Sequence, residues 1–106
     1  MAIELPKFKA HEVRAEIKRI ADSSTHFVEF LDHALDRMEQ RGVTTRQVLR
    51  VLRDGDQEGN AEWCTDKERG WRCRLSRITA GEKITVIAKL VERKNSICLV
   101  VTTWEG

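Results

Sequence analysis

The sequence lacks the features that mark several large classes of protein. No apolar run approaches the roughly 18 residues that a transmembrane helix needs, and the first residues do not have the basic-then-apolar layout of a signal peptide. Tyrosine is absent, and there is no internal repeat or low-complexity segment. A net charge of +2 with 41% hydrophobic residues excludes a disordered chain. At 106 residues the chain is too short for two ordinary domains, so we expect one cytoplasmic domain over residues 1–106 with no membrane contact.

Cysteine is scarce, and its spacing does not indicate a metal site. The three cysteines, Cys64, Cys73 and Cys98, include no C-x-x-C pair. An odd number of cysteines without a signal peptide predicts reduced thiols. A zinc site that combined them with one of the three histidines lacks the usual ligand spacing. We therefore expect no metal and no cofactor.

The first half of the chain has the period of helices. Residues 10–22 place Val13, Ile17 and Ile20 on one face, with charged residues around the rest. Residues 27–31 are short and β-capable, so they are either a strand fragment or the lead into the next helix.

Two further helices follow, each with its own capping residues. Asp32 is a suitable N-cap for a helix over residues 33–41, and Gly42 is placed to end it. Thr44 or Thr45 caps the next helix.

After Gly55 the period changes to that of strands. Residues 61–65 and 71–75 predict strands, and residues 83–92 and 96–104 are β-branched runs typical of central strands. Helices followed by strands favour an α+β fold, because parallel strands would need crossover helices between them. We expect two to three N-terminal helices packed on a C-terminal antiparallel sheet of three to four strands.

The small positive charge is not spread evenly. Residues 1–60 carry 10 basic and 11 acidic side chains, whereas residues 61–106 carry 9 basic and 6 acidic side chains. Most of the excess lies in residues 67–77, where five cations are opposed by Glu68 alone. A low net charge therefore does not exclude a phosphate-binding surface in the second half.

One predicted strand separates apolar and basic side chains. Trp71, Cys73 and Leu75 alternate with Arg72 and Arg74, so the two arginines share the face that the helices do not cover. Arginine matches phosphate in a bidentate geometry. The face is therefore either a phosphate-binding groove or a solvated surface protected against aggregation.

A second basic cluster lies on the predicted helix over residues 33–41. His33, Arg37 and Arg41 are spaced i, i+4 and i+8 and form one stripe. A histidine suits proton transfer, and the arginines would stabilise a developing phosphorane. Two alternatives stay open at this point. The arginines pair with nearby carboxylates on the surface, or His33 and Arg37 point at the sheet and hold the fold.

These residues carry a resemblance to a known family. Residues 32–43, with the sequence DHALDRMEQRGV, resemble the H-A-x-x-R-M-x-x-R-G-[IV] signature of a widespread bacterial family known only as a domain of unknown function. Gly70-Trp71-Arg72 and the strand segments 84–87 and 99–102 match the layout of the same family. The resemblance covers roughly residues 10–104.

That family is similar to the small ribonuclease toxins of the RelE, BrnT and MqsR types. The resemblance implies a RelE-like fold, RNA as the substrate, and a cognate antitoxin protein that covers the basic site. It also implies metal-independent cleavage in which the 2′-hydroxyl attacks the adjacent phosphate. A tyrosine often assists at RelE-type sites, and this chain has none.

Two sets of candidate residues follow. The catalytic set, one histidine with three arginines, is His33, Arg37, Arg41 and Arg74. The nucleic-acid-binding set, four cations with a tryptophan able to stack on a base, is Arg72, Arg77, Lys83, Lys89 and Trp104. The alternative function is a non-enzymatic nucleic-acid- or protein-binding module, for example an inhibitor carried on a mobile element.

Overall fold

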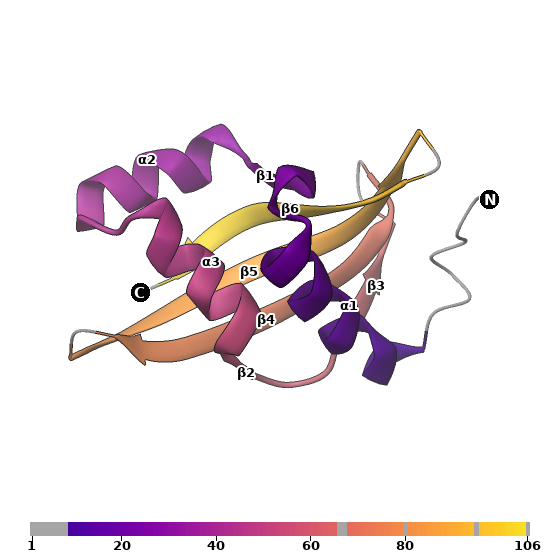
Figure 1. Ribbon diagram of the computed structural model, residues 1–106, viewed down its shortest axis with the longest axis horizontal. Helices are drawn as coiled ribbons and strands as arrows, with labels where there is room; N and C mark the ends of the chain where they lie inside the picture. Colours follow the sequence, from indigo (N-terminus) through magenta and orange to yellow (C-terminus); the bar gives the residue numbers. More distant parts are fainter. Residues whose placement is uncertain (1–8, 66–67, 80, 95, 106) are drawn as a thin grey trace.

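The computed structural model describes residues 9–65, 68–79, 81–94 and 96–105. In this part of the chain three α-helices and six strands form an α+β fold (Figure 1). The helices are α1 (Ala10–Ser23), α2 (Asp32–Arg41) and α3 (Thr45–Asp54). The strands are β1 (Val28–Phe30), β2 (Asp56–Gln57), β3 (Glu62–Cys64), β4 (Gly70–Thr79), β5 (Glu82–Arg93) and β6 (Ser96–Glu105), and a 3-10 turn (Thr25–Phe27) precedes β1.

The sheet has the order β1-β6-β5-β4-β2, and β3 pairs with another part of β4. All pairs are antiparallel except β1 with β6, which is parallel. The expected α+β class is confirmed, but the expected three to four strands become six. The additional strands are the short β1 and β2, and each gains its backbone partners from a strand far along the chain.

Local patterns explain where the helices begin and end. Thr44 caps α3 in a capping box: its hydroxyl accepts from the Gln47 backbone at 3.1 Å, and the Gln47 side chain accepts from the Thr44 backbone at 2.8 Å. Gly42 ends α2 in the left-handed conformation, with φ +67°. The N-cap of α2 is Leu31 rather than the predicted Asp32. Asp32 instead lies in the first turn, where a carboxylate is favoured by the helix dipole.

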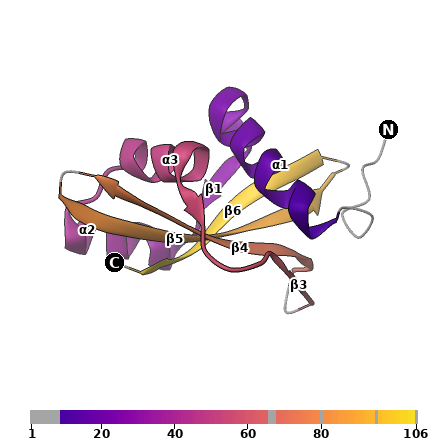
Figure 2. The same ribbon diagram turned by 90° about the horizontal axis from the view of Figure 1, so that it is seen from below.

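Helices α1 and α3 cover one face of the sheet, while α2 and β3 lie toward the opposite side (Figure 2). The strand alternation predicted for β4 is confirmed. Cys73 and Leu75 are buried in the core between sheet and helices, and Trp71 packs against it. Arg72 and Arg74 are exposed on the other face, which we call the open face. None of the described helices is long and apolar enough to cross a membrane.

Arg14 of α1 connects the helical layer to the chain that leaves α3. Its guanidinium donates to the backbone carbonyls of Leu52 at 2.9 Å, Arg53 at 3.1 Å and Gly55 at 2.8 Å. These carbonyls end α3 and have no partner inside the helix. Arg14 therefore fixes where the segment leading to β2 and β3 starts.

Replacement of Arg14 by methionine keeps much of the side-chain volume and removes all three bonds. We expect Arg14→Met to lower the free energy of unfolding by roughly 1–2 kcal/mol, because a half-buried charged donor is lost. Urea unfolding measures this change as a lower midpoint at unchanged slope. The matched control is Arg19→Met on the same helix, which removes an exposed ion pair with Glu16 and moves the midpoint little. Equal midpoints for the two variants would show that Arg14 does not brace α3.

Candidate functional site

The open face carries a cleft of about 350 Å³, which we call the open cleft. It lies where the start of α2 and the strand β3 flank the central strands. Its lining comes from segments far apart in the sequence: Leu31, His33, Cys64, Glu68, Arg72, Lys89, Val91, Arg93, Val100 and Thr102. The sheet pairing explains this meeting, because Arg72 pairs with Lys89 across β4 and β5, and Lys89 pairs with Val100 across β5 and β6.

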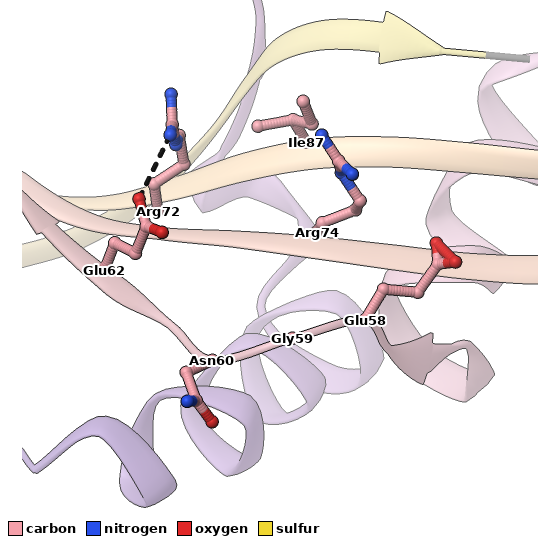
Figure 3. A pocket seen from close by; sticks show the side chains of 7 residues that line it. All are labelled: Glu58, Gly59, Asn60, Glu62, Arg72, Arg74 and Ile87. Atoms are coloured by element: carbon pink, nitrogen blue, oxygen red, sulfur yellow. Dashed lines mark hydrogen bonds and ion pairs between the residues drawn. The ribbon is translucent and has the colours of Figure 1, made fainter.

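A second depression of about 500 Å³, the adjoining hollow, shares Arg72 with the open cleft. The segment from Glu58 to Asn60 forms its rim, and Arg74 and Ile87 lie in it. Arg72 and Arg74 project from β4 to the same side (Figure 3). Arg72 therefore belongs to both cavities and joins them into one continuous surface.

The floor of the open cleft is apolar. Val91 and Val100 are 1% and 3% exposed, although they lie on the face away from the main core. Lys89 and Arg93 rise beside them from alternate positions of β5, and such side chains cover apolar surface with their methylene stems while keeping the charge in water. These stems cover the two valines, so a ring would reach the apolar floor only where the stems move aside, while the charged ends line the cleft.

Arg93 braces one wall of the open cleft. Its guanidinium donates to both carboxylate oxygens of Glu68, at 2.8 and 2.7 Å, and to the carboxylate of Glu29 in β1. The hydrogen bonds to Glu68 and Glu29 raise the pKa of Arg93, and the Arg93 guanidinium lowers the pKa of Glu68. Arg93 therefore stays charged and ties together β1, β5 and the segment that precedes β4.

The other cations of the open face also lie near acceptors. Arg72 forms an ion pair with Glu62 of β3 at 3.2 Å, in which both side chains are at least half exposed. Lys83 donates to Glu58 at 3.0 Å, and this bond lowers the pKa of Glu58, with a smaller contribution from the charge of Arg74. Lys89 donates to the backbone carbonyl of Glu68. On the open face these three cations thus each lie next to a carboxylate or carbonyl oxygen.

The structure brings five of the predicted site residues to the open face. His33, Arg72 and Lys89 line the open cleft, and Arg74 lines the adjoining hollow. Lys83 reaches the same hollow through its bond to Glu58.

The remaining predicted residues lie elsewhere. Arg37 and Arg41 are exposed further along α2 and do not line either cavity. Arg77 lies on the helix-covered face, 3.8 Å from Asp54 of α3, because it is an odd number of residues from Arg72 and Arg74. Trp104 pairs through its backbone with Val86, and its side chain lies outside the part of the chain that the structure describes.

The alternative in which His33 and Arg37 hold the fold does not agree with their position. Both side chains are exposed, and within the described residues neither makes a hydrogen bond or an ion pair. Glu29, one of the carboxylates close in sequence to this helix, is bonded to Arg93 and not to Arg37 or Arg41. The exposed stripe on α2 is therefore accessible to a ligand.

Arg93 and its two carboxylates were missed by sequence reasoning. The strand period gave one usable indication, since Arg93 follows Lys89 by four residues and so shares its face. The role of Glu29 had no sequence signal, because it depends on the parallel pairing of β1 with β6.

The cysteine thiols differ in their surroundings. Cys73 is buried, and burial raises the pKa of its thiol to about 11. Cys64, which lines the open cleft, and Cys98 are half-buried. Among the described residues no group of three or more histidine, cysteine or acidic side chains is arranged to hold a metal ion.

The fold and the site define a small α+β domain whose sheet is covered by α1 and α3 on one face and carries two cavities on the other. The chain belongs to the DUF4258 family, a domain of unknown function, whose model matches residues 30–105. The match runs from the end of β1 through β6, so it includes the open face and excludes α1. No curated protein and no solved structure matches the chain.

The reactivity of the three thiols tests the burial of Cys73. At pH 8 a thiol with a pKa of about 11 is ionised in roughly one molecule in a thousand, and the thiolate is the reactive form. We expect an aromatic disulfide reagent to modify Cys64 and Cys98 in the native protein and Cys73 only after unfolding. Cys73→Ser should leave the native reaction unchanged, as the matched control. Reaction of all three native thiols at one rate would contradict the burial of Cys73.

Proposed function

We propose that the open cleft and the adjoining hollow bind single-stranded RNA and cleave it without a metal ion, as a ribonuclease of the toxin type. The observation that carries this proposal is the position of His33, which shares one cleft with Arg72 and Lys89 although α2 and the strands are far apart in sequence. A proton-transfer group beside two cations is the arrangement that phosphodiester cleavage requires.

The chemistry assigns a role to each side chain. The 2′-hydroxyl of a ribose attacks the adjacent phosphorus, the bond from phosphorus to the 5′ oxygen breaks, and a 2′,3′-cyclic phosphate and a 5′-hydroxyl result. Either the His33 imidazole takes the proton of the 2′-hydroxyl while a water molecule protonates the leaving 5′ oxygen, or a water molecule takes the first proton while the His33 imidazolium supplies the second. Arg72 and Lys89 stabilise the negative charge that develops on the phosphorane. Arg74, in the adjoining hollow, binds the next phosphate.

The apolar floor supports a single-stranded substrate. A base can reach Val91 and Val100 only when it has left its stack and the stems of Lys89 and Arg93 move aside, and proteins that recognise RNA by its bases favour unpaired segments. The resemblance to the RelE, BrnT and MqsR toxins supports the same reaction class. It also supports a second partner, an antitoxin protein that covers the open cleft.

Cleavage of a labelled single-stranded RNA in the presence of EDTA tests the reaction. We expect His33→Ala to slow cleavage about 100-fold or more, because general acid–base catalysis contributes about this much. Arg72→Ala should slow it as well, through loss of phosphate contacts. Arg77→Ala is the matched control, since it removes an arginine from the same strand on the other face, and it should cleave like the wild type.

The cleavage products and the activities of the variants decide between the possible outcomes. A 2′,3′-cyclic phosphate end would identify attack by the 2′-hydroxyl. Cleavage that His33→Ala leaves unchanged would reject the site and keep the reaction class. RNA that is bound but stays intact under all conditions would show that the protein is a binding module and not an enzyme.

The ion pair between Arg72 and Glu62 gives a second prediction. An exposed pair contributes about 0–1 kcal/mol, so a phosphate has to displace Glu62 at only a small cost. We expect Glu62→Gln to tighten RNA binding up to about fivefold, because the guanidinium is then released without that cost. Fluorescence anisotropy with a labelled RNA measures the change. Weaker binding by this variant would show that Glu62 positions Arg72 rather than competes for it.

A further inference from the structure

A third cavity lies on the side of the molecule that faces away from the open cleft. It is a groove of about 590 Å³ between the C-terminal end of α1 and the outer surface of α3. Both helices lie on the covered face of the sheet (Figure 2), so this α1–α3 groove is separate from the proposed RNA site. Ala21 of α1 and Leu49 of α3 are its apolar residues.

Three arginines of α3 line the groove. Arg46, Arg50 and Arg53 are spaced i, i+4 and i+7, so they project from one side of the helix. Arg53 is bound to Asp54, at 2.9 Å. Arg46 and Arg50 are exposed and form no ion pair within the described part of the chain; Asp54 attracts Arg50 only at longer range.

The arginines of the α1–α3 groove differ from the cations of the open face in how they are paired. There, Arg72, Lys83 and Arg93 each form an ion pair with a glutamate. In the α1–α3 groove the guanidiniums of Arg46 and Arg50 have no such partner among the residues that the structure describes. An incoming anionic group therefore meets cations that it does not have to free from a carboxylate.

The floor of the groove distinguishes between kinds of anionic ligand. Ala21 is buried, and Leu49 is half-buried and packs against the core, so they form an apolar strip beneath the arginines. The groove between two packed helices is the site where the side chains of a third helix can interdigitate. Asp22 also lines the groove and repels any anionic group near it, so the acidic groups of a ligand have to lie on the α3 side, toward Arg46 and Arg50.

We propose that the α1–α3 groove binds an acidic amphipathic helix of a partner protein. The apolar residues of that helix lie on Ala21 and Leu49, and its carboxylates pair with Arg46 and Arg50. The proposal does not depend on RNA cleavage, because the groove and the open cleft share no lining residue.

Nuclear magnetic resonance of the full chain tests the position of binding. The probe is a synthetic helical peptide with leucines at i, i+4 and i+7 flanked by glutamates, titrated into ¹⁵N-labelled protein. We expect the backbone amide signals of Ala21, Asp22, Thr25 and Gln47 to shift, while those of Arg72 and Lys89 stay in place. Shifts centred on the open cleft, or no shifts at millimolar peptide, would overturn the proposal.

Charge reversal tests the role of the arginines. The double variant Arg46→Glu/Arg50→Glu should weaken peptide binding at least about tenfold, because two attractions become repulsions. Arg37→Glu/Arg41→Glu on α2 is the matched control, with the same spacing outside the groove, and its affinity should stay within about twofold of the wild type. A peptide with lysine in place of glutamate should bind the first variant better than it binds the wild type. Equal losses in both variants would overturn the proposal.

A single-stranded RNA, added in place of the peptide, separates the two surfaces. RNA should shift the signals of the open cleft and leave those of the α1–α3 groove unchanged. If RNA shifts the groove signals and Arg46→Glu/Arg50→Glu abolishes those shifts, the groove is a nucleic-acid surface and the proposal of a protein partner is wrong.

Discussion

The alternation of side chains from Trp71 to Leu75 of β4 is the constraint on which the rest of the structure depends. Cys73 and Leu75 have to be buried beneath α1 and α3, so Arg72 and Arg74 have to face the other way. The register with β5 then places Lys89 opposite Arg72 on the same face. A shift of one residue would bury the arginines and expose the core, which makes the register costly to change. The core therefore fixes which side chains the open face presents.

Patterns that are local in the sequence predicted local structure well. The apolar stripe of α1, the capping box at Thr44 and the left-handed Gly42 follow from neighbouring residues alone, as does the alternation of β4. The short strand β2 did not follow, and the pattern at β1 fits either a strand fragment or the lead into a helix, since two or three residues become a strand only when a distant strand supplies their backbone partners. The same limit applies to the site. His33 and Arg72 were each identifiable by their chemistry, but their place in one cleft depends on how α2 lies beside the sheet.

The distribution of charge shows how far folding changes a count made along the chain. Residues 61–106 carry the positive excess, yet Glu29 and Glu58 from the first part of the chain are bonded to Arg93 and Lys83 on the sheet. Folding thus moves negative charge from the helical part onto the open face. The helical part, although nearly neutral in sequence, keeps Arg46 and Arg50 without ion pairs among the described residues. The more available cations therefore lie on the helices and not on the strands.

Paired and unpaired cations bind anions by different thermodynamics. At the open face an incoming phosphate would exchange with the carboxylate of an ion pair, so the guanidinium is already oriented and few counterions would leave it. An anion at Arg46 and Arg50, which form no ion pair among the described residues, would displace mobile counterions, and their release would make binding sensitive to salt. If the open cleft is the RNA site proposed above, this exchange would favour ligands that offer more than charge, such as a base that reaches the floor beside Val91 and Val100. We therefore expect such a site to bind simple anions weakly and to prefer a ligand that combines a phosphate with a ring.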